Sequence, residues 1–248
     1  MSLRAVRRGF VLLLSLLFCF LHFQALRLMA ALRGREVTAQ QKAQWMHFCG
    51  RITLPAMGIH YRIEGRLPVG PTLIVANHLS YLDIAILSAA VPCAFVSKIE
   101  IADWPGFGSL ARMGGTIFVD RASRASAWET AQAISERLAI GVPVLFFPEG
   151  TSTDGIEVQR FHSTLFEPAI KRGLTVTPAA VFYEAHGSAT ERDLCWFGND
   201  PFLPHLLQVL GVERFSAVVR FGTPEAFPDR KAAAWRAHDT VSGMRSGN

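Results

Sequence analysis

Residues 75–90 read VANHLSYLDIAILSAA, and an apolar run stops there at an Asn-His pair. The run itself, residues 72–76, has the length and composition of a buried strand, and residues 82–90 have those of a helix. This stretch therefore predicts a strand, a short polar turn and a helix. His78 lies in the turn and Asp83 lies at the start of the helix. A buried strand followed by a helix is the repeating unit of an α/β fold.

The same alternation continues along the chain. Further strands are expected at residues 94–97, 116–119, 144–147, 175–182 and 215–220, and further helices at residues 107–113, 122–140, 163–171 and 203–210. Short buried strands that alternate with helices predict an α/β fold with a mainly parallel central sheet flanked by helices. No internal repeat or long linker interrupts the pattern, so residues 58–248 are expected to form one domain. The tail from Asp229 is expected to be a last helix that frays near Ser246.

Composition restricts the class of protein. The 248 residues are 50% hydrophobic and 18% charged, which excludes a disordered chain, and the mean hydropathy of +0.25 indicates membrane contact. The net charge of +5 suits nucleic acid or an anionic membrane. Basic residues do not cluster with aromatic ones, which argues against nucleic acid. The four cysteines are far apart in the sequence, so neither a metal site nor a disulfide framework is expected.

The first 57 residues are expected to contact a membrane. Residues 9–26 are apolar and have arginines on both sides, but 18 helical residues rise about 27 Å, which is marginal for a bilayer core of about 30 Å. The segment therefore predicts an anchor that either spans the bilayer or dips into one leaflet. A cleaved signal peptide is the alternative, but no small-x-small cleavage site precedes Arg27.

A second helix is expected at residues 37–57. Thr38 is a suitable N-cap, Pro55 is expected to end the helix, and Trp45 is expected at the membrane interface. The alternative is an ordinary helix packed on the domain. Together the two segments predict an N-terminal two-helix membrane-docking unit over residues 1–57.

His78 and Asp83 are candidate catalytic residues. On a continuous helix their spacing of five would place them about 140° apart, but they can meet if His78 lies in the turn before the helix. A carboxylate bonded to one imidazole nitrogen fixes the tautomer and leaves the other nitrogen as a base. No G-x-S-x-G motif supplies a serine nucleophile, so the attacking hydroxyl can belong to the substrate. The structural alternative is a helix-capping aspartate beside a loop histidine.

Two further loops are candidates for anion binding. Residues 114–121 read GGTIFVDR and place an arginine at a strand end, whereas residues 146–155 read FFPEGTSTDG. Gly150 and Gly155 would allow backbone amides to face an anion. Taken singly, the two loops are better explained as a surface arginine and a polar turn. No P-loop lysine is present, which argues against nucleotide hydrolysis.

Three motifs in this order resemble a known family. They are N-H-x-x-x-x-D at residues 77–83, G-x-x-F-x-x-R at residues 115–121 and F-P-E-G-T at residues 147–151, and Thr177-Pro178 resembles a fourth block. The chain resembles the glycerolipid acyltransferase family, which includes the 1-acyl-glycerol-3-phosphate acyltransferases. The resemblance covers roughly residues 45 to 222, and the ordered set is more specific than any one motif.

The resemblance implies an enzyme with residues 58–248 as its catalytic domain. His78 would be the general base and Asp83 would orient it. The acyl donor would be a thioester on coenzyme A or acyl carrier protein, and neither a metal nor a cofactor would be needed. Substrate contacts would come from Asn77, Gly115, Phe118, Arg121, Glu149, Gly150, Thr151, Ser152 and Pro178. Asn77 would lie near the oxyanion and Pro178 near the acyl donor.

The resemblance also implies an acceptor and a location. The expected acceptor is 1-acyl-sn-glycerol-3-phosphate, which gives phosphatidic acid, at a bacterial inner membrane with the catalytic domain facing the cytoplasm. Ser152 departs from this expectation, because many phosphatidate-forming members have arginine after the E-G-T block. Residues 196–205 and the TSTDG loop are more similar to lyso-ornithine-lipid acyltransferases, which remain an alternative. More distant alternatives are an acyl hydrolase and a non-catalytic lipid-binding protein.

Overall fold

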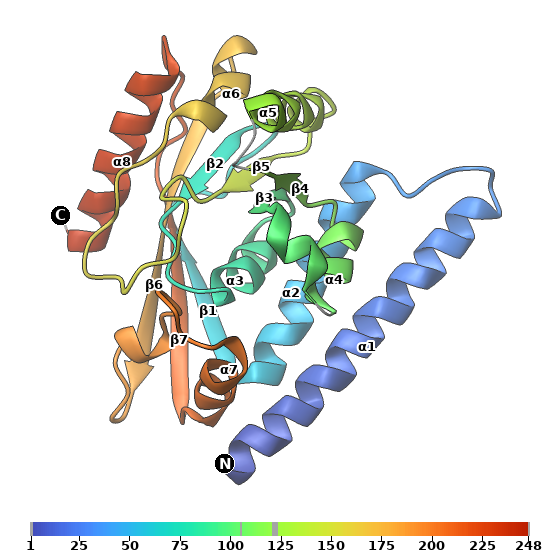
Figure 1. The fold of residues 1–248 in the computed structure, drawn as a ribbon, viewed down its shortest axis with the longest axis vertical. Coiled ribbons are helices and arrows are strands. Elements are labelled where there is room, and N and C mark those ends of the chain that lie inside the picture. Colours follow the sequence, from blue (N-terminus) through green and yellow to red (C-terminus); the bar gives the residue numbers. More distant parts are fainter. Residues whose placement is uncertain (1, 105, 121–123, 248) are drawn as a thin grey trace.

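A mixed β-sheet crosses the centre of the molecule (Figure 1). The structure is a computed structural model that describes residues 2–104, 106–120 and 124–247. Within these residues the strand order is β1-β7-β6-β2-β5-β3-β4. The bounds are β1 Ile59–Glu64, β2 Leu73–Ala76, β3 Ala94–Lys98, β4 Ile117–Val119, β5 Val144–Phe146, β6 Val176–His186 and β7 Arg214–Phe221. β6 and β7 are antiparallel, while the other neighbouring pairs are parallel, which confirms the mainly parallel sheet.

Helices cover both faces of this sheet (Figure 1). They are α1 Leu3–Ala31, α2 Ala39–Met57, α3 Leu82–Ala90, α4 Phe107–Met113, α5 Arg124–Ala139, α6 Glu167–Lys171, α7 Phe202–Gly211 and α8 Arg230–Ser246. One hydrophobic cluster joins α2, α3 and α7 to the sheet, and a second joins α5, α6 and α8 to the other face. β2 supplies both clusters, because Leu73 and Val75 point to one face and Ile74 to the other.

β1 was missing from the strands expected from sequence. Its residues read IHYRIE, and apolar Ile59, Tyr61 and Ile63 alternate with polar side chains. This period of two is the signal of a half-buried strand, and it would have identified β1. At the other end of the chain, the expected last helix is present. The carboxylate of Asp229 accepts the N–H groups of Lys231 and Ala232 and caps α8.

α2 differs from its expected form in two respects. Pro55 lies inside the helix, which continues to Met57 and ends at Gly58, where φ is +77°. This left-handed conformation favours glycine, and a Cβ at Gly58 would also displace the Arg8 guanidinium, which lies 2.3 Å from its position. Trp45 is buried rather than interfacial. Its indole N–H donates to the carbonyl of Cys19 at 3.1 Å, and its ring packs edge-on against Phe23. The tryptophan thus joins α2 to α1.

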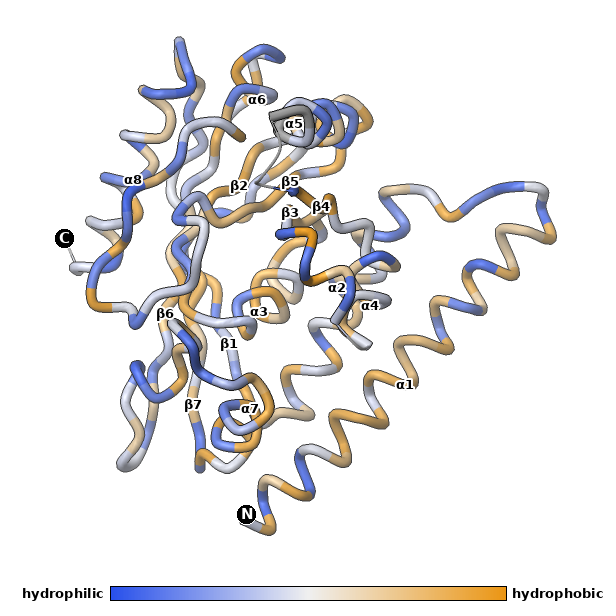
Figure 2. The backbone as a smooth tube through the Cα atoms, viewed as in Figure 1, coloured by the Kyte–Doolittle hydropathy of each residue, from blue (hydrophilic) through white to orange (hydrophobic). Residues whose placement is uncertain are grey.

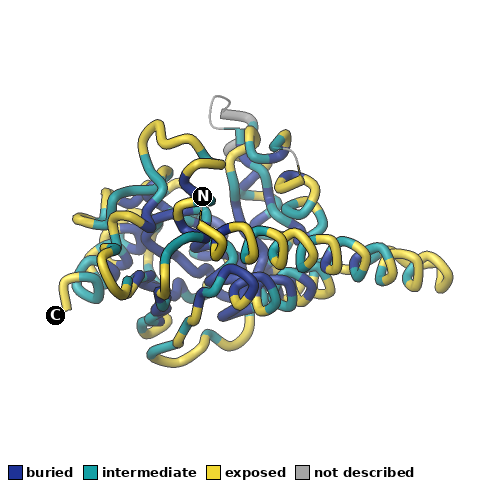
Figure 3. The backbone as a smooth tube through the Cα atoms, turned by 90° about the horizontal axis from the view of Figure 1, so that it is seen from below, coloured by how far each residue is buried: buried dark blue, intermediate teal, exposed yellow. Residues whose placement is uncertain are grey.

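α1 extends beyond both ends of the apolar segment, residues 9–26, that was noted in the sequence. It begins after the N-cap Ser2 and contains 29 residues, with apolar residues in its middle and arginines toward both ends (Figure 2). Within the described residues, it is the helix with the length and apolar composition needed to cross a membrane. The view from below shows how much of it is exposed (Figure 3). Near its N-terminus Arg8 donates to the carbonyls of Leu210 and Val212, and so holds α1 against the C-terminal end of α7.

Candidate active site

The turn after β2 places His78 beside Asp83. The two side chains form a hydrogen bond of 2.8 Å between His78 Nδ1 and Asp83 Oδ2, which confirms that the pair meets across the turn. An ionised carboxylate only accepts hydrogen bonds, so Nδ1 carries the proton and Nε2 keeps a lone pair. The imidazole stacks on Phe147, with ring centroids 4.0 Å apart. The geometry gives His78 the tautomer of a general base.

Asp83 is fully buried, and its carboxylate is surrounded by donors. Oδ2 accepts the backbone N–H groups of Leu79 and Ser80 at 2.7 and 3.1 Å, in addition to His78. Oδ1 accepts the hydroxyl of Tyr183 on β6. Four donors thus stabilise a negative charge that has no contact with water. Asp83 also lies in the first turn of α3, where the helix dipole favours an acidic side chain.

Glu149 holds the His78 loop from the end of β5. Its two carboxylate oxygens accept the backbone N–H groups of His78 at 2.6 Å and Gln159 at 2.7 Å. Burial raises the pKa of Glu149 to about 7, while these two hydrogen bonds oppose the shift. Thr153 N–H also donates to the His78 carbonyl at 2.9 Å. The loops after β2 and β5 therefore form one bonded unit, because parallel strands end at the same edge of the sheet.

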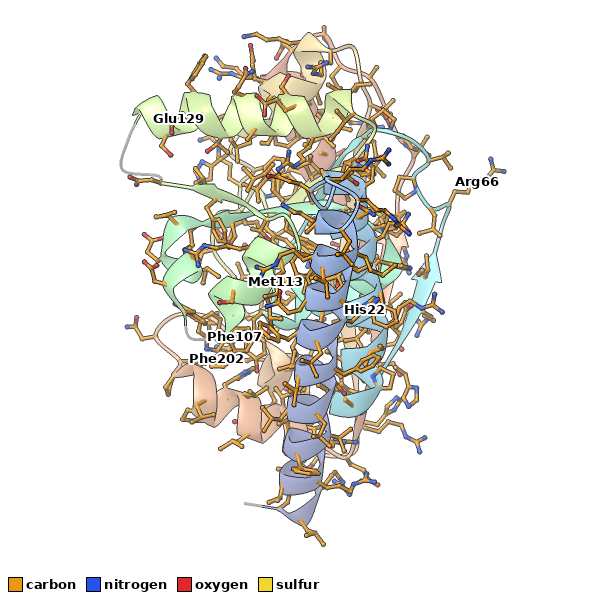
Figure 4. All side chains as sticks on the ribbon, turned by 90° about the vertical axis from the view of Figure 1, so that its right-hand side faces the viewer. His22, Arg66, Phe107, Met113, Glu129 and Phe202 are labelled. Atoms are coloured by element: carbon orange, nitrogen blue, oxygen red, sulfur yellow. The ribbon has the colours of Figure 1, made fainter. Side chains whose placement is uncertain are left out.

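A largely apolar cavity of about 300 Å³ adjoins His78. The His78 side chain lines it and is 19% exposed. Three helices supply part of the apolar lining, with Leu12 and Leu16 from α1, Trp45 and Met46 from α2, and Ile84 from α3. The rest comes from four aromatic residues, Trp104, Phe107, Trp196 and Phe202. Phe107 and Phe202 lie side by side, with centroids 5.1 Å apart (Figure 4). Such a lining fits a hydrocarbon chain.

Some of the residues expected to bind substrate line this cavity. Gly150, Thr151 and Ser152 do so, together with His78. Gly115 and Phe118 are absent from its described lining, although Thr116 and Val119 contribute to it. Side chains alternate along β4, so Phe118 points away from the side that carries Val119 and instead lies under the Arg112 guanidinium. Arg121 lies outside the described residues.

Three other expected contacts belong to the framework of the site. The Asn77 side chain bonds both backbone polar groups of Val181, at 3.1 and 2.8 Å, and is buried. Glu149 is occupied by two backbone N–H groups, as described above. Pro178 lies inside β6 opposite Val75 and is absent from the described cavity lining. The described contacts of Asn77, Glu149 and Pro178 are therefore contacts within the protein, and their direct contact with substrate stays a prediction.

Several residues of the site carried no usable signal in the sequence. Tyr183 is an isolated hydroxyl within an apolar strand, 100 residues from the carboxylate that it contacts. Trp196 and Phe202 lie in the 196–205 segment noted above, but their aromatic cluster with Tyr81 and Trp104 could not be predicted from the sequence. Only the folded chain brings these residues together.

Comparison with known proteins defines the class of this fold and site. A family model described as Acyltransferase matches residues 58–182. A lyso-ornithine lipid O-acyltransferase from Rhodobacter capsulatus is 40% identical over 203 residues, which make up 78% of this chain and 73% of that protein. The chain therefore belongs to the acyltransferase family, and it is an enzyme of the acyltransferase class.

A second relative and a solved structure are also similar to this chain. A 1-acyl-sn-glycerol-3-phosphate acyltransferase from Neisseria meningitidis is 36% identical over 146 residues, which make up 58% of this chain and 57% of that protein. The crystal structure of the 1-acyl-sn-glycerophosphate acyltransferase PlsC from Thermotoga maritima has a TM-score of 0.66, with 97% of each chain covered and 21% identity. At that identity the likeness concerns the fold alone.

Proposed function

We propose that the chain transfers a fatty acyl group from an acyl thioester to the hydroxyl group of a lysolipid. The thioester is carried by coenzyme A or acyl carrier protein. The observation that carries this proposal is the His78–Asp83 pair beside an apolar cavity. An acyl chain needs an apolar cavity, and a hydroxyl nucleophile needs a neighbouring base.

The proposed reaction needs no covalent enzyme intermediate. The lysolipid oxygen attacks the thioester carbonyl while Nε2 of His78 removes the hydroxyl proton. Asp83 stabilises the resulting imidazolium through Nδ1. A new C–O bond forms, and the tetrahedral oxyanion then collapses and breaks the C–S bond. The thiolate leaves and takes the proton from His78, so the enzyme returns to its starting state without a metal or cofactor.

For the acceptor we propose lyso-ornithine lipid in preference to 1-acyl-sn-glycerol-3-phosphate. Support comes from lyso-ornithine lipid O-acyltransferases of Rhodobacter capsulatus and of Pseudomonas aeruginosa, the latter 35% identical over 85% of this chain. The loop beside His78 supports it too, because Ser152 lines the cavity where the resemblance places an arginine in phosphatidate-forming members. A serine hydroxyl cannot neutralise a phosphate dianion as an arginine can.

We further propose that the enzyme acts at a bacterial inner membrane with the catalytic domain on the cytoplasmic side. α1 contacts the end of α7 through Arg8, near its N-terminus, and contacts α2 near its middle, where Trp45 donates to the Cys19 carbonyl and packs against Phe23. A helix held at two places against the rest of the chain fits a position in one leaflet better than a full span. Leu12, Leu16 and Cys19 of the same helix line the cavity, so a lipid chain would have a short path from the membrane.

A panel of lysolipids tests this proposal. Purified protein in mixed micelles receives one acyl thioester and, in separate reactions, lyso-ornithine lipid or 1-acyl-sn-glycerol-3-phosphate, and mass spectrometry identifies the products. We expect diacylated ornithine lipid to form faster than phosphatidic acid. A preference for the phosphate acceptor would contradict the headgroup assignment. Free fatty acid in place of a diacyl lipid would indicate a hydrolase and contradict acyl transfer.

A further inference from the structure

Tyr183 extends the His78–Asp83 pair toward the interior. It lies on β6, where it pairs with Ala217 of β7, and it is 3% exposed. Its hydroxyl donates to Asp83 Oδ1, whereas His78 contacts the other oxygen of the same carboxylate. The three side chains therefore form a line from the interior of the sheet to the cavity.

The two oxygens of Asp83 are not equivalent. Oδ2 accepts three hydrogen bonds, from His78 and from the backbone of Leu79 and Ser80. Within the described part of the chain, Tyr183 supplies the hydrogen bond to Oδ1. A buried anionic oxygen without a donor is costly, and Asp83 is fully buried. The phenol thus supports the ionised form of the carboxylate.

The position of Tyr183 is fixed from its other side. Its backbone N–H donates to Glu191 Oε1 at 2.8 Å, and Arg245 of α8 binds both oxygens of Glu191 at 2.8 and 3.0 Å. Its ring packs edge-on against Phe215. Burial and the Asp83 charge hold the pKa of the Tyr183 phenol well above its usual value, so the hydroxyl keeps its proton as a donor.

We propose that Tyr183 is a positioning residue for acyl transfer, which sets the charge and orientation of Asp83 and, through Asp83, of His78. This inference rests on the proposed function, because it assigns a role within the same site. The hydroxyl does not touch the cavity, so it acts on the reaction through the carboxylate alone.

Other ionisable groups surround the Tyr183–Asp83–His78 line, and they stay the same when only the Tyr183 hydroxyl is removed. Glu149 faces His78 and Asp83 from the loop after β5, and Tyr81 and Cys195 face Tyr183. Glu191, which binds Arg245, accepts the backbone N–H of Tyr183. Replacement of the Tyr183 hydroxyl alone leaves each of these groups in place.

Tyr183→Phe tests the role, with Tyr61→Phe as a matched control. Tyr61 also donates its hydroxyl inside the fold, to the carbonyl of Ala89, but it lies away from the cavity lining. We expect Tyr183→Phe to lower kcat about 10- to 100-fold with little change in KM, as for loss of a hydrogen bond to a charged group. In a plot of kcat/KM against pH, activity falls at low pH, and we call this fall the acid limb. The acid limb of Tyr183→Phe should lie at higher pH, because an Asp83 carboxylate without its Tyr183 donor lets the His78–Asp83 pair hold a proton more tightly. Tyr61→Phe leaves both quantities within about twofold of wild type.

Two further measurements separate this inference from the proposed function. The NMR titration of the His78 imidazole, assigned with His78→Ala, reports on the pair without any turnover and should shift in Tyr183→Phe. Incorporation of 3-fluorotyrosine in a Tyr61→Phe, Tyr81→Phe background places the label at Tyr183 alone, since the chain has three tyrosines. Compared with the same double variant containing ordinary tyrosine, this more acidic phenol should move the acid limb to lower pH, opposite to Tyr183→Phe, and its ring still packs in place.

The outcomes are distinct. Suppose that the wild type is active and that Tyr183→Phe has the same acid limb, kcat and NMR titration as the wild type. This result overturns the positioning role of Tyr183 and leaves the proposed acyl transfer intact. A wild type without transferase activity overturns the proposed function, while the NMR titration still tests the coupling of Tyr183 to His78. If Tyr183→Phe fails to fold, the fluorotyrosine protein decides, and an unmoved acid limb there contradicts the inference.

Discussion

Glu149 has a carboxylate that stabilises the site through its backbone contacts. It joins the N–H groups of His78 and Gln159, and both oxygens are used. Burial penalises the ionised form of Glu149 and raises its pKa to about 7. The two backbone N–H groups nevertheless favour the ionised form, because both of its oxygens can accept a hydrogen bond. The residue therefore holds the catalytic loop at a cost that depends on pH.

This pH dependence gives a prediction for stability. A carboxyl group whose folded pKa is raised from 4.5 to about 7 contributes stability below pH 4.5 and loses it as the pH rises through about 7. The free energy of unfolding should therefore fall by as much as about 3 kcal/mol between pH 5 and pH 8. Glu149→Gln removes the titration, so its unfolding free energy should change less over this interval.

Chemical denaturation of the detergent-solubilised protein at the two pH values measures the effect. Glu149→Gln should also be less stable at pH 5, by about 1–3 kcal/mol, because the single oxygen of glutamine leaves one backbone N–H without an acceptor. Parallel pH profiles for the two proteins would refute the burial effect on this carboxyl.

The contacts of a residue could be predicted from the sequence when its partners lie nearby in the chain. His78 and Asp83 lie five residues apart, so turn geometry was enough to predict that they can meet if His78 lies in the turn before the helix. Glu149 was also singled out, but its two backbone contacts were not predicted, because sequence places a carboxylate in a loop without saying which way it points. Its partners, His78 and Gln159, follow from the pairing of β2 with β5. Tyr183 could not be predicted, because its contact depends on the neighbouring positions of β6 and β2.

At the scale of elements, the crossing of α2 over α3 depends on Gly50. A Cβ at this position would lie 2.4 Å from Ser88 Oγ and 2.7 Å from the backbone of Ala85 and Ala89. The two helices therefore touch backbone to backbone. α3 carries Asp83, so a displaced α2 would also disturb the site.

Gly50→Ala should destabilise the protein by about 1–3 kcal/mol, because the backbone of α3 cannot yield as a flexible side chain would. Gly243→Ala is the matched control. A Cβ there meets nothing within 4 Å inside α8, so this change should stabilise the helix by about 0.5–1 kcal/mol. Thermal unfolding of the two variants measures both effects, and an equal response at the two positions would contradict close packing at Gly50.

The elements themselves were largely predictable. Buried strands such as β2 and β5 are short apolar runs bounded by polar turns, which is the strongest local signal of an α/β fold. The environment of Trp45 was not predictable, because an amphipathic helix looks the same whether its apolar face meets a membrane or another helix. Here that face meets α1, and in the proposed function it is α1 that contacts the membrane.

At the scale of the whole molecule, α1 has two apolar faces with different surroundings. Leu12, Leu16 and Cys19 line the cavity, while Leu14, Leu17 and Leu21 point outward and are about half exposed. An exposed apolar face of this kind on a basic protein is typical of a helix that lies in a membrane.

The triple variant Leu14→Glu, Leu17→Glu, Leu21→Glu should therefore lose at least about tenfold in affinity for vesicles that contain phosphatidylglycerol. Sedimentation with vesicles measures this affinity. The control is Leu67→Glu, Val69→Glu, Ile156→Glu, which adds the same charge at exposed apolar positions away from α1 and should lose much less. If both variants bind equally, charge alone explains the loss and the docking face is assigned wrongly.

The central claim is that His78 takes the proton from the acceptor hydroxyl, so that acyl transfer is direct. A single-turnover reaction of wild type and His78→Ala, quenched over time and read by mass spectrometry of both lipid and protein, tests it. We expect His78→Ala to fold and bind vesicles normally but to form diacyl product at least about 10³-fold more slowly, with no acylated protein in the wild-type reaction before the product appears. Turnover of His78→Ala within tenfold of wild type, or an acyl group on the protein ahead of the product, would contradict the mechanism.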